Sequence, residues 1–127
     1  MPIKETSTGL RHFFRAFGYS MSGLKAACCR ESAIRHEIIM GIILVPLSFW
    51  LPIGMVMRAL MTSWLFLIFT VELLNTGIEA IVDLASPDWH ELAKYAKDTA
   101  SAAVFCILCG YGILWAFALA QWLCHAD

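Results

Sequence analysis

Three long uncharged stretches alternate with polar segments along the chain. The first runs from Ile38 to Met57, the second from Ala59 to Val71, and the third from Thr99 to Cys124. A helix that crosses a bilayer needs about 17 to 25 mostly apolar residues, so the first and third stretches qualify directly. The second qualifies only if its helix continues through more polar residues to about Leu84. The spanning helices are therefore expected over about 31–52, 57–85 and 97–124.

Large apolar side chains also recur at helical spacing before the first span. They are Leu10, Phe13, Phe14, Phe17, Met21 and Leu24. Because Arg11, Arg15 and Lys25 fall on other faces, a helix over about 8–27 is expected, with Ser7 or Thr8 as its cap. Such a helix suits the membrane interface, and it would equally suit packing against the rest of the protein.

A polar stripe follows the apolar part of the second span. Glu72, Asn75, Glu79 and Asp83 stand at intervals of three, four and four residues. At about 100° per residue they fall within roughly an 80° arc of one helix face. Ionisable groups inside a membrane helix cost about 2.5 to 3.5 kcal/mol each on insertion scales, so they are expected to serve a function.

The spacing within the stripe limits what it can bind. Glu72 and Glu79 share a face but lie about 10.5 Å apart along the axis, too far to hold one small ion together. An extended phosphate chain with Mg²⁺ at one end would span that distance, and Lys97 and Asp98 would add a cation and a further carboxylate. No Walker loop or protein-kinase glycine loop is present in the sequence. Phosphoryl transfer, an ion or proton path, and a polar seam that only fixes helix packing all stay open at this point.

Composition supports a membrane protein. The 127 residues are 60% hydrophobic and only 15% charged, far from the usual soluble balance of about a quarter charged. A net charge of -1 argues against nucleic acid as a partner. The five cysteines show no metal or disulfide framework, because the one C-x-x-C match, Cys106 to Cys109, lies inside an apolar helix. No signal peptide precedes the first span, which is expected to direct its own insertion.

The distribution of basic residues predicts the orientation. Arg58 alone lies between the first two spans, and Lys94 and Lys97 lie between the second and third. Six more precede the first span: Lys4, Arg11, Arg15, Lys25, Arg30 and Arg35. By the positive-inside rule, the N-terminus and the second connection are expected in the cytoplasm.

Several motifs together resemble one family. Residues 71–83 read VELLNTGIEAIVD, residues 90–92 read HEL, and residues 96–98 read AKD. With the stretches 18–27 and 31–37, this combination closely resembles the bacterial integral-membrane diacylglycerol kinases, a family that includes the undecaprenol kinases. The resemblance covers nearly the whole chain.

The resemblance implies an all-α membrane protein, with three transmembrane helices and an N-terminal amphipathic surface helix. It further implies a homotrimer whose active sites are shared between subunits at the cytoplasmic side of the bacterial inner membrane. Within such a site, Glu72 would be the general base, while Glu31 and Glu79 would bind Mg²⁺.

The resemblance also implies which residues contact ATP and the lipid. His12 stands where the familiar enzymes have an arginine, and Asp88 and Trp89 replace a glutamate and a tyrosine. The ATP positions are His12, Tyr19, Glu31, Asn75, Glu79, Asp88, Trp89, His90, Lys97 and Asp98. The lipid positions are His12, Ser20, Ala33, Ile34, Arg35, His36, Glu37, Trp50, Glu72 and Ser101.

The leading hypothesis is therefore an ATP- and Mg²⁺-dependent kinase that converts diacylglycerol to phosphatidic acid. The N-terminal stretch and Trp50 favour this branch of the family, whereas residues 82–94 contain features of the undecaprenol kinases. A small oligomeric proton or cation channel is the alternative from another class. A channel would carry current without nucleotide, and a kinase would not.

Overall fold

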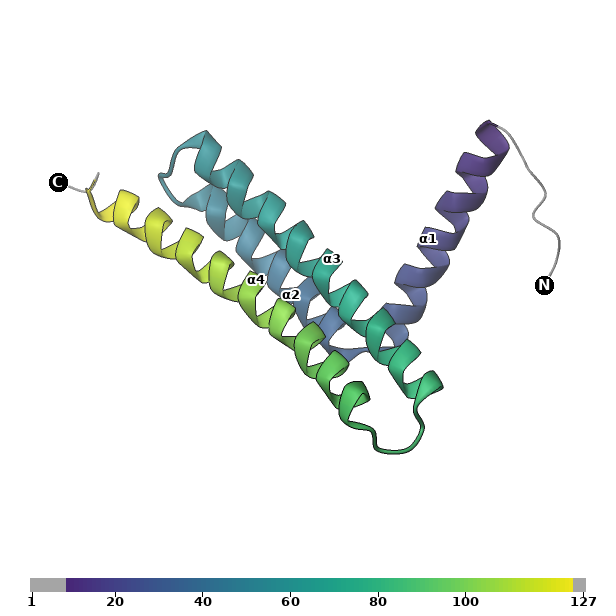
Figure 1. Ribbon diagram of the computed structural model, residues 1–127. Helices are drawn as coiled ribbons and strands as arrows, with labels where there is room; N and C mark the ends of the chain where they lie inside the picture. The colour runs from purple at the N-terminus through teal and green to yellow at the C-terminus, as the bar shows by residue number, and fades with distance from the viewer. Residues whose placement is uncertain (1–8, 125–127) are drawn as a thin grey trace. The chain divides into compact units, whose positions relative to one another are not determined.

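All the regular secondary structure of the described residues is helical. The computed structural model describes residues 9–124, which form four helices: α1 (Leu10–Arg30), α2 (Ser32–Trp50), α3 (Met55–Ala85) and α4 (Glu91–Cys124) (Figure 1). Contacts divide the described residues into two units, 9–31 and 32–124. Helices α2, α3 and α4 are each long and apolar enough to cross a membrane. The predicted all-α class is confirmed, as is the presence of three helices long and apolar enough to span a membrane.

Helix α1 makes up most of the first unit. It begins after Gly9, whose φ of 88° is a conformation that glycine adopts without steric cost. The predicted start at residue 8 and the candidate caps Ser7 and Thr8 lie outside the described residues. The helix ends three residues beyond the predicted 27, where Glu31 turns to an extended conformation and donates its N–H to Ala27 O at 2.8 Å. Its placement at a membrane surface stays a prediction.

Helix α2 opens the second unit and continues through Pro46. Membrane helices tolerate an internal proline because neighbouring groups satisfy the freed carbonyl. At its C-terminal end, Arg58 of α3 donates from Nε to Ser48 O at 3.2 Å and from Nη2 to Leu51 O at 2.9 Å. These bonds satisfy carbonyls that the helix end leaves without intrahelical partners. The guanidinium of Arg58 thus caps the C-terminal end of α2.

Helix α3 is unbroken from the apolar run through the polar stripe. Its 31 residues confirm that the second span reaches far enough only by including the striped turns. Helix α4 begins at Glu91, well before the expected 97. An acidic first turn favours a helix N-terminus, and the Lys94–Asp98 pair at i, i+4 supports the added turns. The turn signal at Ser86 and Pro87 is correctly placed, but the connection is shorter than predicted.

The closest packing in this unit joins α3 to α4, which run side by side in Figure 1. Trp64 of α3 donates its indole N–H to Ile107 O at 2.9 Å. A Cβ added to Gly110 would stand 2.5 Å from Cζ2 of Trp64, so only glycine leaves room for the ring. Around this contact, Met61 is 1% exposed and Ala118 is 0% exposed.

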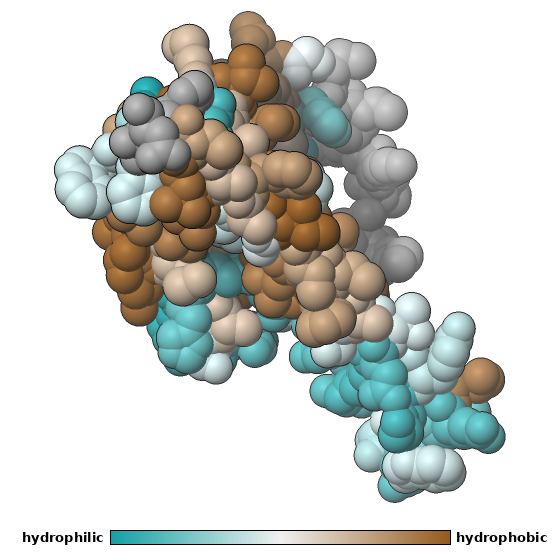
Figure 2. Space-filling view, turned by 90° about the vertical axis from the view of Figure 1, so that its left-hand side faces the viewer, coloured by the Kyte–Doolittle hydropathy of each residue, from teal (hydrophilic) through white to brown (hydrophobic). Residues whose placement is uncertain are grey.

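Most of the remaining surface is apolar. Only 11% to 17% of the residues in the apolar windows of α2, α3 and α4 are buried within the chain. Hydrophobic residues, drawn in brown in Figure 2, cover much of the face that the view presents. Exposed apolar surface on this scale suits contact with lipid or with other membrane helices.

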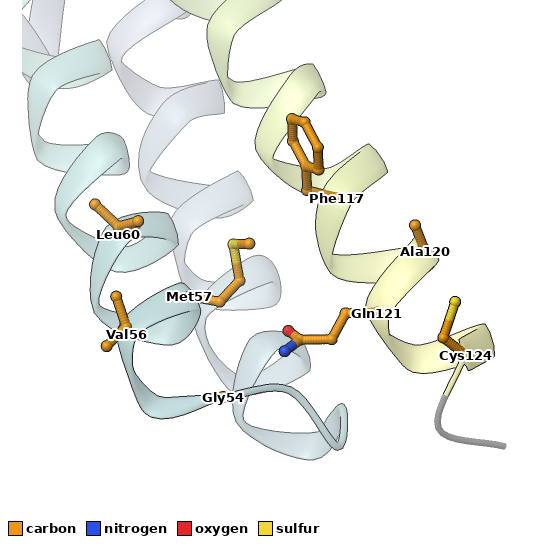
Figure 3. Close-up of a pocket in the computed structure, with 8 residues that line it drawn as sticks. All are labelled: Gly54, Val56, Met57, Leu60, Phe117, Ala120, Gln121 and Cys124. Atoms are coloured by element: carbon orange, nitrogen blue, oxygen red, sulfur yellow. The ribbon is translucent and has the colours of Figure 1, made fainter.

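An apolar groove of about 480 Å³ lies where α3 begins and α4 ends. Figure 3 shows its lining, with the Gln121 amide turned toward Gly54. Gln121 is the only polar side chain among the residues that line it: Gly54, Val56, Met57, Leu60, Phe117, Ala120, Gln121 and Cys124. With no acid, base or cation in its lining, the groove lacks groups for acid–base catalysis.

Candidate active site

The four residues of the polar stripe lie on α3 and become more exposed toward its C-terminal end. Glu72 is 7% exposed and Asn75 is 9% exposed, Glu79 is half-buried, and the side chain of Asp83 is 65% exposed. The stripe is therefore buried within the bundle at Glu72 and exposed at Asp83. Burying a carboxyl to the extent of Glu72 costs free energy, so such a residue is expected to have a compensating partner or a function.

Hydrogen bonding links two members of the stripe. Nδ2 of Asn75 donates to Oε1 of Glu79 over 3.5 Å, a long contact that leaves the carboxylate able to bind other ligands. The other amide atom, Oδ1 of Asn75, is buried and has no hydrogen-bond partner among the described residues. A buried acceptor without a partner costs about 1 to 3 kcal/mol, which a bound ligand or water would relieve.

A second helix brings a further carboxyl to the stripe. Glu37 of α2 lies close enough to Glu72 for their negative charges to repel one another. Its Oε2 is buried without a hydrogen-bond partner in the described part of the chain. The structure therefore brings together two residues that the family resemblance assigns to the lipid substrate, one from α2 and one from α3.

Helix α4 contributes two lysines near the end of the stripe. Nζ of Lys97 lies 2.6 Å from Oδ1 of Asp83 and is also attracted by the charge of Glu79. Lys94 forms an ion pair with Asp98 one turn later on the same helix. Sequence reasoning missed both pairings, although the i, i+4 spacing of Lys94 and Asp98 is a signal that reveals the second.

A cavity of about 410 Å³ adjoins these lysines at the turn between α3 and α4. The turn is shaped locally: Ser86 Oγ donates to Asp88 O at 3.0 Å, and His90 Nδ1 accepts the Leu92 N–H at 3.1 Å. Five predicted ATP positions line the cavity: Asp88, Trp89, His90, Lys97 and Asp98. The structure thus gathers half of the predicted nucleotide residues, and it places Asn75 and Glu79 farther along the stripe of α3.

Four predicted site residues belong to the first unit. His12, Tyr19 and Ser20 are exposed on α1, with Ser20 Oγ donating to Ala16 O at 3.1 Å. Glu31 follows the last residue of that helix. Their approach to ATP, to the metal or to the lipid stays a prediction.

The remaining lipid positions are spread along the three-helix unit. Near the start of α2, Ala33, Arg35 and His36 are exposed, whereas Ile34 is 0% exposed and presents no side chain to a ligand. Trp50 ends the same helix and is 82% exposed. At 1.5 Å per residue, the distance along α2 from Glu37 to Trp50 is about 20 Å. A ligand must have a long tail to contact both.

Ser101, the last lipid position, is exposed on α4, one turn beyond Lys97. Residues four apart share a helix face, so this hydroxyl and the ammonium of Lys97 lie on the same side of α4. A lipid held at Ser101 would therefore lie beside the lysine that pairs with the stripe.

The oxygen ligands in the stripe fit a hard divalent cation. No group of three or more His, Cys, Asp or Glu side chains within residues 9–124 is arranged to hold a metal alone. Mg²⁺ is commonly bound by one or two carboxylates together with substrate phosphates, so a complete protein cage is not required. The half-buried carboxylate of Glu79, beside the unpartnered Oδ1 of Asn75, has the chemistry of such a partial site.

Comparison with known proteins explains why these residues occur together. The family profile of prokaryotic diacylglycerol kinase matches residues 18–119, which include the stripe, the turn and most of α4. The chain belongs to the prokaryotic diacylglycerol kinase family. The resemblance of the motifs in 71–83, 90–92 and 96–98 is therefore confirmed.

Curated relatives in this family are similar over most of their length. The diacylglycerol kinase of Haemophilus influenzae is 43% identical over 109 residues, which cover 86% of this chain and 92% of that protein. The diacylglycerol kinase of Pseudomonas aeruginosa is 42% identical over 109 residues, covering 86% and 89%. That of Escherichia coli K12 is 38% identical over 117 residues, covering 92% and 96%. The matches thus extend well beyond the motifs.

Proposed function

We propose that the protein is an ATP- and Mg²⁺-dependent lipid kinase that phosphorylates diacylglycerol to phosphatidic acid. The observation that carries this proposal is the buried carboxyl of Glu72, which heads a stripe leading to a lysine-bearing cavity at the membrane-spanning helix ends. Membership of the family and relatives named diacylglycerol kinase support the same activity.

In the proposed reaction, Glu72 accepts the proton of the lipid hydroxyl as that oxygen attacks the γ-phosphorus of ATP. The new oxygen–phosphorus bond replaces the bond from the γ-phosphorus to the bridging oxygen, and ADP leaves. A positioned base contributes about 10²- to 10⁴-fold to such a step. The burial of Glu72 suits an acceptor whose hydroxyl lies where the glycerol meets the acyl chains.

The nucleotide is proposed to bind along the turn cavity, with Asp88, Trp89 and His90 at one end and Lys97 near the phosphates. Asp98, Asn75 and Tyr19 are assigned to the same ligand. His12 is assigned to it as well, with an imidazole in place of the arginine of the familiar enzymes. Mg²⁺ would be held by Glu79 and Glu31, and when bound it would neutralise phosphate charge. Phosphoryl transfer depends mainly on such positioning and charge stabilisation.

The lipid is proposed to lie along α2 and α4. Glu37, Arg35 and Ser101 would surround its polar head, and Trp50 would contact its tail about 20 Å away along α2. The neighbouring positions Ser20, Ala33, Ile34 and His36 are assigned to the same ligand, although the buried side chain of Ile34 would act only through packing.

The proposed assembly is a homotrimer in the bacterial inner membrane. Few residues of α2, α3 and α4 are buried within one chain, so neighbouring copies would cover part of the apolar surface and complete each site. Helix α1 would lie at the cytoplasmic surface as an amphipathic helix. The charge distribution supports this orientation, because Arg58, in the first turn of α3, is the only basic residue near the connection between α2 and α3.

A phosphate-transfer assay tests the proposal. The purified full chain in detergent micelles is given ATP labelled at the γ-phosphate, with Mg²⁺ and either diacylglycerol or undecaprenol. We expect labelled phosphatidic acid to form faster than labelled undecaprenyl phosphate, and transfer to stop when the Mg²⁺ is chelated. Faster turnover of undecaprenol would replace the proposed substrate. Absence of transfer to either lipid would refute a lipid kinase, and a bilayer current without nucleotide would then favour a channel.

A further inference from the structure

Asp83 is the member of the polar stripe to which the proposed function assigns no role. It lies near the C-terminal end of α3, two residues before the last helical residue, Ala85. The backbone carbonyls there create a negative field, so an acidic side chain in this position is unfavourable unless a cation lies beside it. The sequence nevertheless places a carboxylate there, on the same face as Glu79.

The cation beside Asp83 comes from another helix. Oδ1 of Asp83 lies 2.6 Å from Nζ of Lys97, and this pair joins α3 to α4. The second ion pair, Lys94 with Asp98, lies within α4 and has both side chains more than 60% exposed. Lys97 is less exposed, at 38%, so its ammonium group is more restricted than that of Lys94.

The contact with Asp83 restricts where the ammonium of Lys97 can lie, and the charge of Glu79 adds a weaker attraction. Glu79 also attracts Lys97, and it precedes Asp83 by one helical turn on α3. A lysine side chain has four flexible bonds and loses considerable rotamer freedom when a ligand orders it. A lysine already held by a carboxylate loses less freedom on binding, and its ammonium keeps further N–H donors for a ligand.

We propose that Asp83 is a positioning residue that holds the ammonium of Lys97 at the edge of the turn cavity, directed toward a polyphosphate. The cavity is lined by both residues. Asp83 acts through Lys97 and does not itself touch the nucleotide. The inference rests on the proposed function in that the polyphosphate is taken to be ATP.

The opposite role is physically distinct. If Asp83 only competed with the nucleotide for Lys97, removal of its charge would free the lysine and reduce repulsion of the phosphates. The KM for ATP would then fall. If Asp83 positions Lys97, the same substitution raises the KM for ATP, because the lysine must be ordered at each binding event.

Steady-state kinetics of the full chain in micelles separate these roles. For Asp83→Asn we expect the KM for ATP to rise about 3- to 10-fold, with the KM for the lipid unchanged. Asp83→Glu, which retains the carboxylate, is expected to recover most of the loss. Glu91→Gln is the matched control, since it removes an exposed acid from the first turn of α4, and its KM for ATP is expected to equal that of the wild type. An unchanged or lowered KM in Asp83→Asn would overturn the inference.

Chemical labelling gives a readout that does not require kinase activity. Amine acylation needs the unprotonated lysine, so an ion-paired ammonium reacts slowly. Mass spectrometry of the acetylated protein is expected to show Lys97 reacting several-fold faster in Asp83→Asn than in the wild type, with the rate at Lys94 unchanged. Equal rates at Lys97 would refute the contact. If wild-type protein transfers no phosphate yet this difference appears, the proposed function fails while the positioning contact stands.

Discussion

Among residues 9–124, Arg58 is the single charged side chain at the end where α2 turns into α3, and backbone carbonyls accept two of its hydrogen bonds. Its guanidinium donates to Ser48 O and Leu51 O and lies 5.7 Å from the centre of the Phe49 ring. At the other end, carboxylates outnumber lysines on α3 and α4. Asp83 and Lys97 pair with each other, and Asn75 keeps a buried oxygen without a partner in the described residues.

The difference separates two uses of charge in a membrane protein. A charge that donates hydrogen bonds to backbone carbonyls helps to complete a helix end. Charges that face one another across helices, beside a cavity and a buried carboxyl, remain available for binding and catalysis. Substitutions at the Arg58 end should therefore change stability, and those in the stripe should change activity.

The largest expected effect is at Glu72. Glu72→Gln keeps the size and polarity of the side chain but cannot accept the substrate proton, so kcat is expected to fall about 10²- to 10⁴-fold. The thermal midpoint is expected to change little. Turnover close to that of the wild type would remove Glu72 from its assigned role, and a large loss of stability would break the comparison between the two ends.

Arg58 provides the reverse test. Arg58→Met keeps much of the stem but loses the bonds to two carbonyls, and bonds from a charged donor contribute about 1.5 to 3 kcal/mol. We expect a corresponding loss of stability in SDS or thermal unfolding, with kcat per folded molecule unchanged. Arg58→Lys, which keeps the charge without the planar fork, should recover only part of the loss. A fall in kcat with intact stability would contradict a purely structural role.

Packing between α3 and α4 gives a similar but smaller expected change. Gly110→Ala would force a methyl group against the Trp64 ring, and overpacking costs about 1 to 3 kcal/mol. Gly112→Ala is the matched control, because a Cβ there meets no atom within 4 Å. The two unfolding midpoints should therefore move differently, with that of Gly110→Ala lower. Equal midpoints would show that the ring can shift without cost.

The smallest of these effects is expected at Glu79. Glu79→Gln removes the negative charge of a proposed Mg²⁺ ligand while retaining an oxygen, so the Mg²⁺ concentration for half-maximal rate should rise about tenfold, equivalent to about 1.4 kcal/mol. Titration of activity with Mg²⁺ at saturating ATP measures it, with Glu91→Gln as the control. An unchanged Mg²⁺ dependence would count against Glu79 as a ligand.

Periodicity predicted much of this arrangement. The three-four-four spacing placed Glu72, Asn75 and Glu79 on one face, and the length needed to cross a bilayer required α3 to run through them. The start of α4 was misplaced because the polar residues before Lys97 read as a loop, although they form the exposed first turns of a helix.

Periodicity did not predict the contacts between helices. The partner of Asp83 depends on where α4 begins and on how it lies against α3, which no spacing within one helix specifies. The same holds for the fit of Trp64 against Gly110, because in the sequence a glycine within an apolar helix indicates only a lower helix propensity. The roles proposed for residues such as Glu31 and Trp50 come from the family resemblance alone, because neither residue belongs to a spacing pattern that points to a site.

The sparse burial within α2, α3 and α4 affects how the protein unfolds. The backbone bonds of a helix in a bilayer are satisfied within that helix, so hydrocarbon maintains each helix even when its neighbours leave. Loss of native structure in micelles should therefore separate intact helices rather than melt them. Far-UV circular dichroism would hardly change, while a probe at the Trp64 ring would report the transition.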